Sequence, residues 1–383
     1  MNKTFDVVVV GAGYIGCATA YYLSKAGLKT ALVERGEVAA GASRANYGNI
    51  QVQDAELEYS LLMILRGYQE CLRIEEELGC PVKLRKLGSL LVIENPKQWE
   101  IMSARQKKLA AAGIHAELVP SEHLREIEPM INPSETIGAL YHPDEAQIFP
   151  FDLMWAYIRR ARTFGLALLT NTEVIDFQIR SGRLTGIHTT QGEISTGNVI
   201  LTTGAWTRKL GEKIEKDWAI YHVHGQSLVT EPLQYTFQNH FSSAAFFEDI
   251  CEETPAGESA VLAIAQAWHG NMLLGEASFP SEALASHATP GAPQVIAEQF
   301  ERFFPKFKNL RVLRGWASPV AYTPDSLPYF GPVADLPGLI LAAAFRSTVI
   351  VTPLTGQTIT QMITTGKTDL DISHFSPDRK VVS

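Results

Sequence analysis

The most constraining feature of this 383-residue chain is a strand, loop and helix pattern within its first 34 residues. Residues 6–10 read DVVVV, a β-branched run typical of a parallel strand buried on both faces. The segment GAGYIG follows directly at 11–16, then the helically spaced CATAYYLSKAG, and then a second strand, KTALVE, which ends in Glu34. This order predicts a dinucleotide-binding unit: a strand, the G-x-G-x-x-G loop, a helix, and a second strand that ends in an acid.

Each residue of the motif has a physical task in this interpretation. Gly11 makes the tight turn, Gly13 lets a pyrophosphate approach the backbone, and Gly16 allows the helix to pack closely on the strand. The phosphates then lie at the helix N-terminus. Glu34 accepts hydrogen bonds from ribose hydroxyls and repels a 2'-phosphate, which argues against an NADP-type ligand. The motif itself leaves FAD and NAD open.

The segment after Glu34 is a loop rich in glycine and alanine, RGEVAAGASRANYGNIQ, at residues 35–51. A simple nicotinamide-binding unit would continue into helix and strand at this point. Small residues allow a loop to wrap closely over a large flat ligand, so the composition favours a flavin-facing loop. A long flexible loop is the alternative interpretation.

Composition and charge narrow the class of protein. The formal net charge is -8, with 33 Lys+Arg against 41 Asp+Glu and no basic cluster, so nucleic acid is not an expected partner. No glycine-free run of 18 uncharged apolar residues occurs, so we expect no membrane span. The cysteines lack C-x-x-C spacing, which favours a reduced cytoplasm over a disulfide framework or a metal site. They are Cys17, Cys71, Cys80 and Cys251.

Over nearly its whole length the sequence resembles the FAD-dependent D-amino-acid oxidase superfamily, in the branch of glycine oxidase, sarcosine oxidase and D-amino-acid dehydrogenases. Besides the N-terminal motif, the matching segments are GASRANYGN, LGSLLVIEN, LREIEPMI, IFPFDL, the stretch at 172–206, HGQSLVTE and TPDSLPYFGP. Together they are far more specific than any one motif.

The resemblance implies an α/β fold, α+β overall, with a Rossmann-like FAD-binding domain of the glutathione-reductase type. A discontinuous substrate domain built on an antiparallel sheet accompanies it. We expect the FAD-binding domain at 1–80, 145–212 and 315–383, and the substrate domain at 81–144 and 213–314. The stretch 172–206 reads as a β-meander with turns at Gly182 and Gly192.

The resemblance also implies non-covalent FAD, since no cysteine lies in the C-terminal FAD region. Val174 is expected at the adenine, the loop at 203–206 beneath the cofactor, and Asp325 near the ribityl chain. The complete set of expected FAD contacts is Gly11, Gly13, Ile15, Gly16, Glu34, Arg35, Ala42, Ser43, Arg44, Asn46, Tyr47, Gly48, Asn49, Val174, Thr203, Gly204, Trp206, Asp325, Arg346, Ser347, Thr348 and Val349.

One cation, Arg346, interrupts an apolar and hydroxyl-bearing run at 339–356. Burying a guanidinium is costly unless an anion meets it, so the run indicates either a structural ion pair or an anionic ligand. The family places a substrate-carboxylate arginine here, and a guanidinium matches a carboxylate with two parallel hydrogen bonds. Relatives commonly have glycine around this arginine, where this chain has Ala343 and Thr348.

Further candidates lie near the expected flavin. Thr352 and Pro353 read as the N-cap and first residue of a helix that ends at Gly366, with its positive end facing the flavin. Tyr47 is a candidate for the flavin or substrate cavity. His222 and His224 alternate on a strand, so His224 is a candidate substrate contact, although such histidines more often serve packing.

The resemblance implies that hydride leaves the carbon bearing an amine for flavin N5, and that water hydrolyses the resulting imine. The sequence is similar to catalytic β subunits of dye-linked opine oxidases and proline dehydrogenases, which act with partner subunits carrying further redox centres. A stand-alone oxidase or dehydrogenase for glycine, sarcosine or a D-amino acid is the alternative. A non-catalytic FAD-bound scaffold and an NAD dehydrogenase are the remaining ones.

Overall fold

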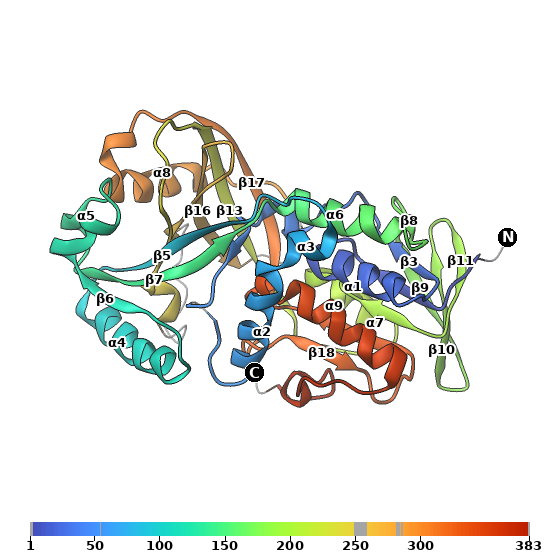
Figure 1. Ribbon diagram of the computed structural model, residues 1–383. Coiled ribbons are helices and arrows are strands. Elements are labelled where there is room, and N and C mark those ends of the chain that lie inside the picture. Colours follow the sequence, from blue (N-terminus) through green and yellow to red (C-terminus); the bar gives the residue numbers. More distant parts are fainter. Residues whose placement is uncertain (1–2, 54, 249–258, 281–283, 285, 382–383) are drawn as a thin grey trace.

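The computed structural model describes residues 3–53, 55–248, 259–280, 284 and 286–381, and Cys251 lies outside them. Figure 1 shows two halves: helices α1 and α9 lie with one sheet on the right, and a second, larger sheet occupies the left. The described helices include none with both the length and the apolar character needed to cross a membrane.

The right half is built on a six-stranded sheet that is parallel except at one edge. Its order is β18 (Tyr329–Pro332), β19 (Leu339–Ala343), β12 (Val199–Leu201), β2 (Val7–Val10), β3 (Thr30–Val33) and β8 (Ala167–Leu169), with β18 antiparallel. All four residues of β2 are buried, as a strand with both faces covered requires. The predicted βαβ unit is therefore present, with β2, α1 (Tyr14–Lys25) and β3 in order.

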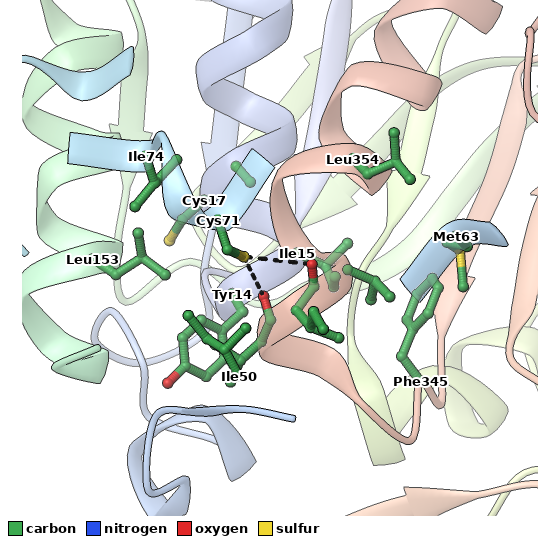
Figure 2. Close-up of a cluster of buried hydrophobic side chains, with 14 of the residues drawn as sticks. Tyr14, Ile15, Cys17, Ile50, Met63, Cys71, Ile74, Leu153, Phe345 and Leu354 are labelled. Carbon is green, nitrogen blue, oxygen red and sulfur yellow. Dashed lines mark hydrogen bonds between the residues drawn. The ribbon is translucent and has the colours of Figure 1, made fainter. Parts of the chain in front are cut away.

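Helix α9 (Thr348–Thr365) packs against α1 at a close crossing, where a Cβ on Gly356 would lie 2.8 Å from Tyr22 Cδ2. Residues of both helices, with α2 (Leu61–Leu72), α3 (Ile74–Leu78) and α6 (Pro150–Arg162), form one apolar core (Figure 2). The helix that carries the glycine motif is thus fixed from several sides.

The predicted start of α9 was wrong, because the helix begins at Thr348 and Pro353 lies inside it. A proline within a helix leaves the carbonyl four residues earlier, here that of Val349, without its N–H partner. The Cys71 thiol lies 3.7 Å from the Val349 oxygen and 3.5 Å from the Ile350 oxygen, and donates to both (Figure 2). The predicted end at Gly366 is confirmed by its left-handed backbone, with φ of 70°.

A separate four-stranded sheet flanks this half. Its order is β1 (Lys3–Thr4), β11 (Gly192–Ser195), β10 (Arg183–Thr189) and β9 (Val174–Arg180). The predicted meander with turns at Gly182 and Gly192 is therefore confirmed. The next strand, β12, leaves the meander and joins the six-stranded sheet, which carries the following loop toward the glycine motif.

The left half is built on a nine-stranded sheet that is mostly antiparallel, with one parallel pairing between β14 and β5. Its order is β17 (Val312–Tyr322), β13 (Tyr221–Pro232), β16 (Asn271–Pro280), β15 (Ser259–Gln266), β14 (Asn239–Ser243), β5 (Arg85–Ile93), β7 (Gly138–Gln147) and β4 (Asn49–Ile50), with β6 (Glu117–Pro120) paired to β7. The expected domain boundaries at 145 and 315 fall inside β7 and β17.

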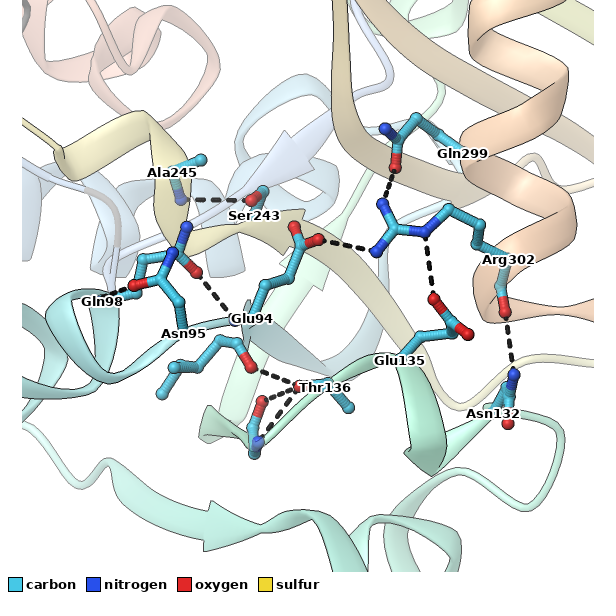
Figure 3. A network of polar contacts seen from close by, with 12 residues as sticks. Glu94, Asn95, Gln98, Asn132, Glu135, Thr136, Ser243, Ala245, Gln299 and Arg302 are labelled. Atoms are coloured by element: carbon cyan, nitrogen blue, oxygen red, sulfur yellow. Dashed lines mark hydrogen bonds and ion pairs between the residues drawn. The ribbon is translucent and has the colours of Figure 1, made fainter.

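Helix α8 (Ala292–Phe303) covers this sheet and ends before Pro305, since a proline cannot continue a helix. Arg302 at its end pairs with Glu94 at 3.0 Å and Glu135 at 3.1 Å (Figure 3). Figure 1 shows α4 (Pro96–Ala111) and α5 (Leu124–Ile127) at the far edge of this half.

Candidate functional site

The glycine motif forms an open backbone cradle at the N-terminus of α1. Gly11 has φ of +101°, a conformation that favours glycine, and its N–H donates to the Val33 carbonyl at 2.8 Å. A Cβ on Gly13 would lie 2.8 Å from Ser43 Oγ, so the loop at 42–45 lies against the motif. The cradle thus has the shape that a pyrophosphate needs at a helix N-terminus.

Glu34 lies at the end of β3 beside this cradle. Its carboxylate accepts hydrogen bonds from the N–H groups of Ala12 and Gly36, both at 2.9 Å. These bonds fix the carboxylate at the cavity wall while leaving lone pairs for ribose hydroxyls. Arg35 stacks over the Trp206 ring at 4.0 Å and closes the same end of the cavity.

A cavity of about 450 Å³ extends from the cradle along the carboxyl ends of the parallel strands. This edge is where open α/β sheets bind their ligands. The expected FAD contacts that line it are Gly11, Gly13, Ile15, Glu34, Arg35, Ala42, Ser43, Val174, Thr203, Gly204, Trp206 and Thr348.

A second cavity of about 250 Å³ lies between the two halves, and shares Val320, Ala321, Phe345 and Thr348 with the first. Other expected contacts line this second cavity: Asn46, Tyr47, Asn49, Arg346, Ser347 and Val349. The structure therefore divides the expected set between a cofactor-sized space and an adjoining smaller one.

Four expected contacts line neither cavity. Gly16 and Gly48 are places of close backbone packing, since a Cβ on either would collide with the carbonyl of Gly11 or Ile148. Arg44 is exposed. Asp325 is held instead by Arg379 at 2.8 Å and by the Leu327 N–H at 3.1 Å; although burial opposes it, these contacts lower the pKa of Asp325.

Arg346 lies in the loop between β19 and α9, at the second cavity. Its side chain is exposed, and no carboxylate of the described residues forms an ion pair with it. The structural ion pair considered for this arginine is therefore not found in that part of the chain. Ala344 adopts φ of 61°, a left-handed conformation that costs a non-glycine residue energy.

Several polar side chains line the second cavity besides Arg346, and Tyr47 and Gln51 are two of them. Tyr47 donates its hydroxyl to Ser227 Oγ at 2.8 Å, and burial raises the pKa of Tyr47. Gln51 Nε2 is buried and has no acceptor in the described part of the chain. The Thr348 hydroxyl, expected near the flavin, donates instead to the Phe345 carbonyl at 2.8 Å.

His224 lines neither cavity. Its neighbour Gly225 faces the cavity side, because a Cβ there would lie 3.5 Å from Glu276 Oε1, and successive residues of a strand face opposite ways. The described residues also hold no cluster of three or more His, Cys, Asp or Glu suited to a metal ion.

Sequence reasoning missed Glu276 and Tyr322, which both line the second cavity. The only signal was a single acid within MLLGEA, an otherwise apolar strand, and it does not reveal which face the acid occupies. Burial raises the pKa of Glu276 to about 7.

Comparison with known proteins matches this geometry. The family described as DAO, FAD dependent oxidoreductase, matches residues 6–362. Glycine oxidase of Geobacillus kaustophilus (strain HTA426) is 24% identical over 392 residues, covering 100% of this chain and 98% of the relative. Sarcosine oxidase subunit beta of Arthrobacter sp. is 28% identical, covering 88% of this chain and 81% of that protein. The crystal structure of L-proline dehydrogenase from P. horikoshii superposes with a TM-score of 0.86 at 25% identity, covering 98% of both chains.

These comparisons confirm the predicted architecture and decide between the two dinucleotides. The matched family uses FAD, and its match includes every strand of the six-stranded sheet as well as the loop that holds Arg346. The cofactor of this chain is accordingly FAD.

Proposed function

Because the chain belongs to the DAO family of FAD-dependent oxidoreductases, we propose that it oxidises the carbon–nitrogen bond of an amine that bears a carboxylate, such as an amino acid or an opine. The observation that carries the proposal is Arg346, a cation that no carboxylate of the described residues pairs with, at the cavity that adjoins the proposed FAD site. A guanidinium in this position is suited to hold a substrate carboxylate through two parallel hydrogen bonds.

Bound FAD supplies the hydride acceptor, and the protein supplies position and electrostatics. The glycine cradle, with Ser43 against it, and Glu34 hold the dinucleotide end of FAD, and Thr348, which lines both cavities, lies toward the flavin end. Arg346 fixes the carboxylate, and so restricts which C–H bond of the substrate meets the flavin. The N-terminus of α9 at Thr348 presents the positive end of an 18-residue helix, which favours the negative charge that develops on reduction.

Two forms of this function differ in the acceptor that takes the electrons from the reduced flavin. A role as the catalytic subunit of a heteromeric dehydrogenase is supported by similarity to a protein named as a sarcosine oxidase subunit. A stand-alone oxidase or dehydrogenase is supported by end-to-end similarity to glycine oxidase. Co-purification with other subunits, and reaction with a dye but hardly with oxygen, favours the first form.

The first prediction concerns Arg346. Anaerobic mixing of the holoenzyme with amino acids, N-methyl amino acids, proline and opines should bleach the flavin with at least one of them. Arg346→Lys and Arg346→Ala should raise the concentration of that substrate needed for half-saturation. The rise should correspond to roughly 2 to 5 kcal/mol of binding free energy, because a charged bidentate contact is lost.

Arg208→Ala is the matched control, since Arg208 is a surface arginine on α7 (Thr207–Glu212) that pairs with Asp217 at 3.0 Å and lines neither cavity. Unchanged half-saturation in both Arg346 variants would contradict the carboxylate role. Full flavin occupancy without bleaching by any amine would point to a non-catalytic scaffold.

A further inference from the structure

The second cavity holds one carboxylate and one cation. Among the residues lining it in the described ranges, Glu276 is the single acid and Arg346 the single base. Glu276 lies on β16, in the nine-stranded sheet, whereas Arg346 lies beyond β19 of the six-stranded sheet. The two charges therefore come from opposite walls of the space between the halves.

Glu276 has no partner among the residues that the structure describes. Within the described chain no side chain or backbone group donates a hydrogen bond to its carboxylate and no cation pairs with it; burial is the single cause that raises its pKa to about 7. Its neighbours are small or neutral: Gly225 leaves a Cβ-sized space 3.5 Å from Oε1, and Tyr47 already donates to Ser227. A partly buried carboxyl group left without donors costs stability, and a functional ligand would compensate for it.

Tyr322 lies close enough to both charged groups for each of them to affect its pKa. Burial raises the pKa of Tyr322; the Glu276 carboxylate raises it further, and the Arg346 guanidinium lowers it. The phenol thus lies within electrostatic reach of both groups, although Glu276 and Arg346 form no ion pair with each other. Opposite charges held apart across a cavity complement a ligand with an anion at one end and a cation at the other.

We propose that Glu276 is a specificity-determining residue that receives the cationic nitrogen of the substrate while Arg346 holds its carboxylate. The proposal rests on the proposed function and adds to it the residue that recognises the charged nitrogen. A second carboxylate directed at Glu276 would meet a like charge, so an opine would have to present its amine to Glu276 and direct its other carboxylate elsewhere.

The test compares ligands that differ only in the charged nitrogen, on the holoenzyme. Suitable pairs are sarcosine with methoxyacetate, proline with tetrahydro-2-furoate, and glycine with glycolate. The amine of each pair is followed by anaerobic flavin bleaching, and the oxygen analogue by perturbation of the flavin absorbance. The variants are Glu276→Gln, Glu276→Asp and Arg346→Ala, with Glu117→Gln as the control, since Glu117 is an exposed carboxylate on β6.

We expect Glu276→Gln to weaken half-saturation by the amine roughly 30-fold or more, the loss typical of a buried charge contact. Binding of the oxygen analogue should stay unchanged or tighten, because it carries no cation. Glu276→Asp should fall between the wild type and Glu276→Gln, and Glu117→Gln should leave both ligands unaffected.

Arg346→Ala should weaken both members of the pair. If it weakens both while Glu276→Gln changes them equally or not at all, the role of Glu276 is overturned and the proposed function stands. If Arg346→Ala changes neither ligand, the carboxylate-binding function fails and the role of Glu276 fails with it. If Glu276→Gln does not fold, Glu276→Asp replaces it. The proposal is then overturned if the ratio of the half-saturation concentrations of amine and oxygen analogue is the same in Glu276→Asp as in the wild type.

Discussion

At the scale of single residues, Glu276 lines the second cavity and also makes the stability of the folded protein depend on pH. Its pKa is raised by burial from 4.5 to about 7, so the folded protein holds a proton that the unfolded chain has released. The free energy of unfolding must then fall as pH rises through this range. Glu276→Gln should match the wild type near pH 5 and exceed it at pH 8 by about 1 to 3 kcal/mol. The ionisable groups that line the cavity with it are Tyr47, Tyr322 and Arg346; burial raises the pKa of both tyrosines, so neither phenol ionises over this range.

Thermal unfolding of the FAD-saturated protein at both pH values measures this difference, with Glu117→Gln as the control. An equal gain or loss at pH 5 and pH 8 would show that Glu276 does not titrate in the folded protein.

At the scale of elements, the crossing of α9 over α1 positions the cradle, and Gly356 makes that crossing possible. A Cβ there would lie 2.8 Å from Tyr22 Cδ2 and 2.9 Å from the Ala18 carbonyl carbon. Alanine normally stabilises a helix relative to glycine by about 1 kcal/mol, so a net loss would identify the crossing as the cause. We expect Gly356→Ala to lower the free energy of unfolding by about 1 to 3 kcal/mol. Urea unfolding measures it, and the exposed Thr364→Ala on α9 should change it by no more than about 0.5 kcal/mol.

At the scale of the whole molecule, the first cavity, which we propose holds FAD, joins segments from both ends and the middle of the chain. A ligand that binds only this assembled form must stabilise it, by about 2.7 kcal/mol at a concentration 100 times Kd. Adding FAD to the apoprotein should therefore raise its Tm, and acid precipitation should leave the yellow colour in the supernatant. Gly13→Val should abolish the rise in Tm because its side chain would meet Ser43, whereas Gly197→Ala, with open space around it, should not.

In the acid precipitation, a yellow pellet would refute non-covalent binding of the flavin.

The sequence alone determined what depends on neighbouring residues. The βαβ unit, the meander and the end of α9 follow from local spacing and from glycines that need special backbone conformations. Arg346 could be singled out as a lone cation in an apolar run, but the burial that this run suggested is not found, because the Arg346 side chain is exposed at the second cavity.

The tertiary structure decided what depends on partners distant in the chain. Asp325 is paired with Arg379, 54 residues away, and the Cys71 thiol meets the carbonyl that Pro353 leaves free, 278 residues away. Strand alternation shows that His224 and Gly225 face opposite ways, but only the packed sheet shows that the side of Gly225 faces the cavity. Glu276 was hidden for the same reason: a charge acquires its role from the groups that packing places around it, and none of these is adjacent in sequence.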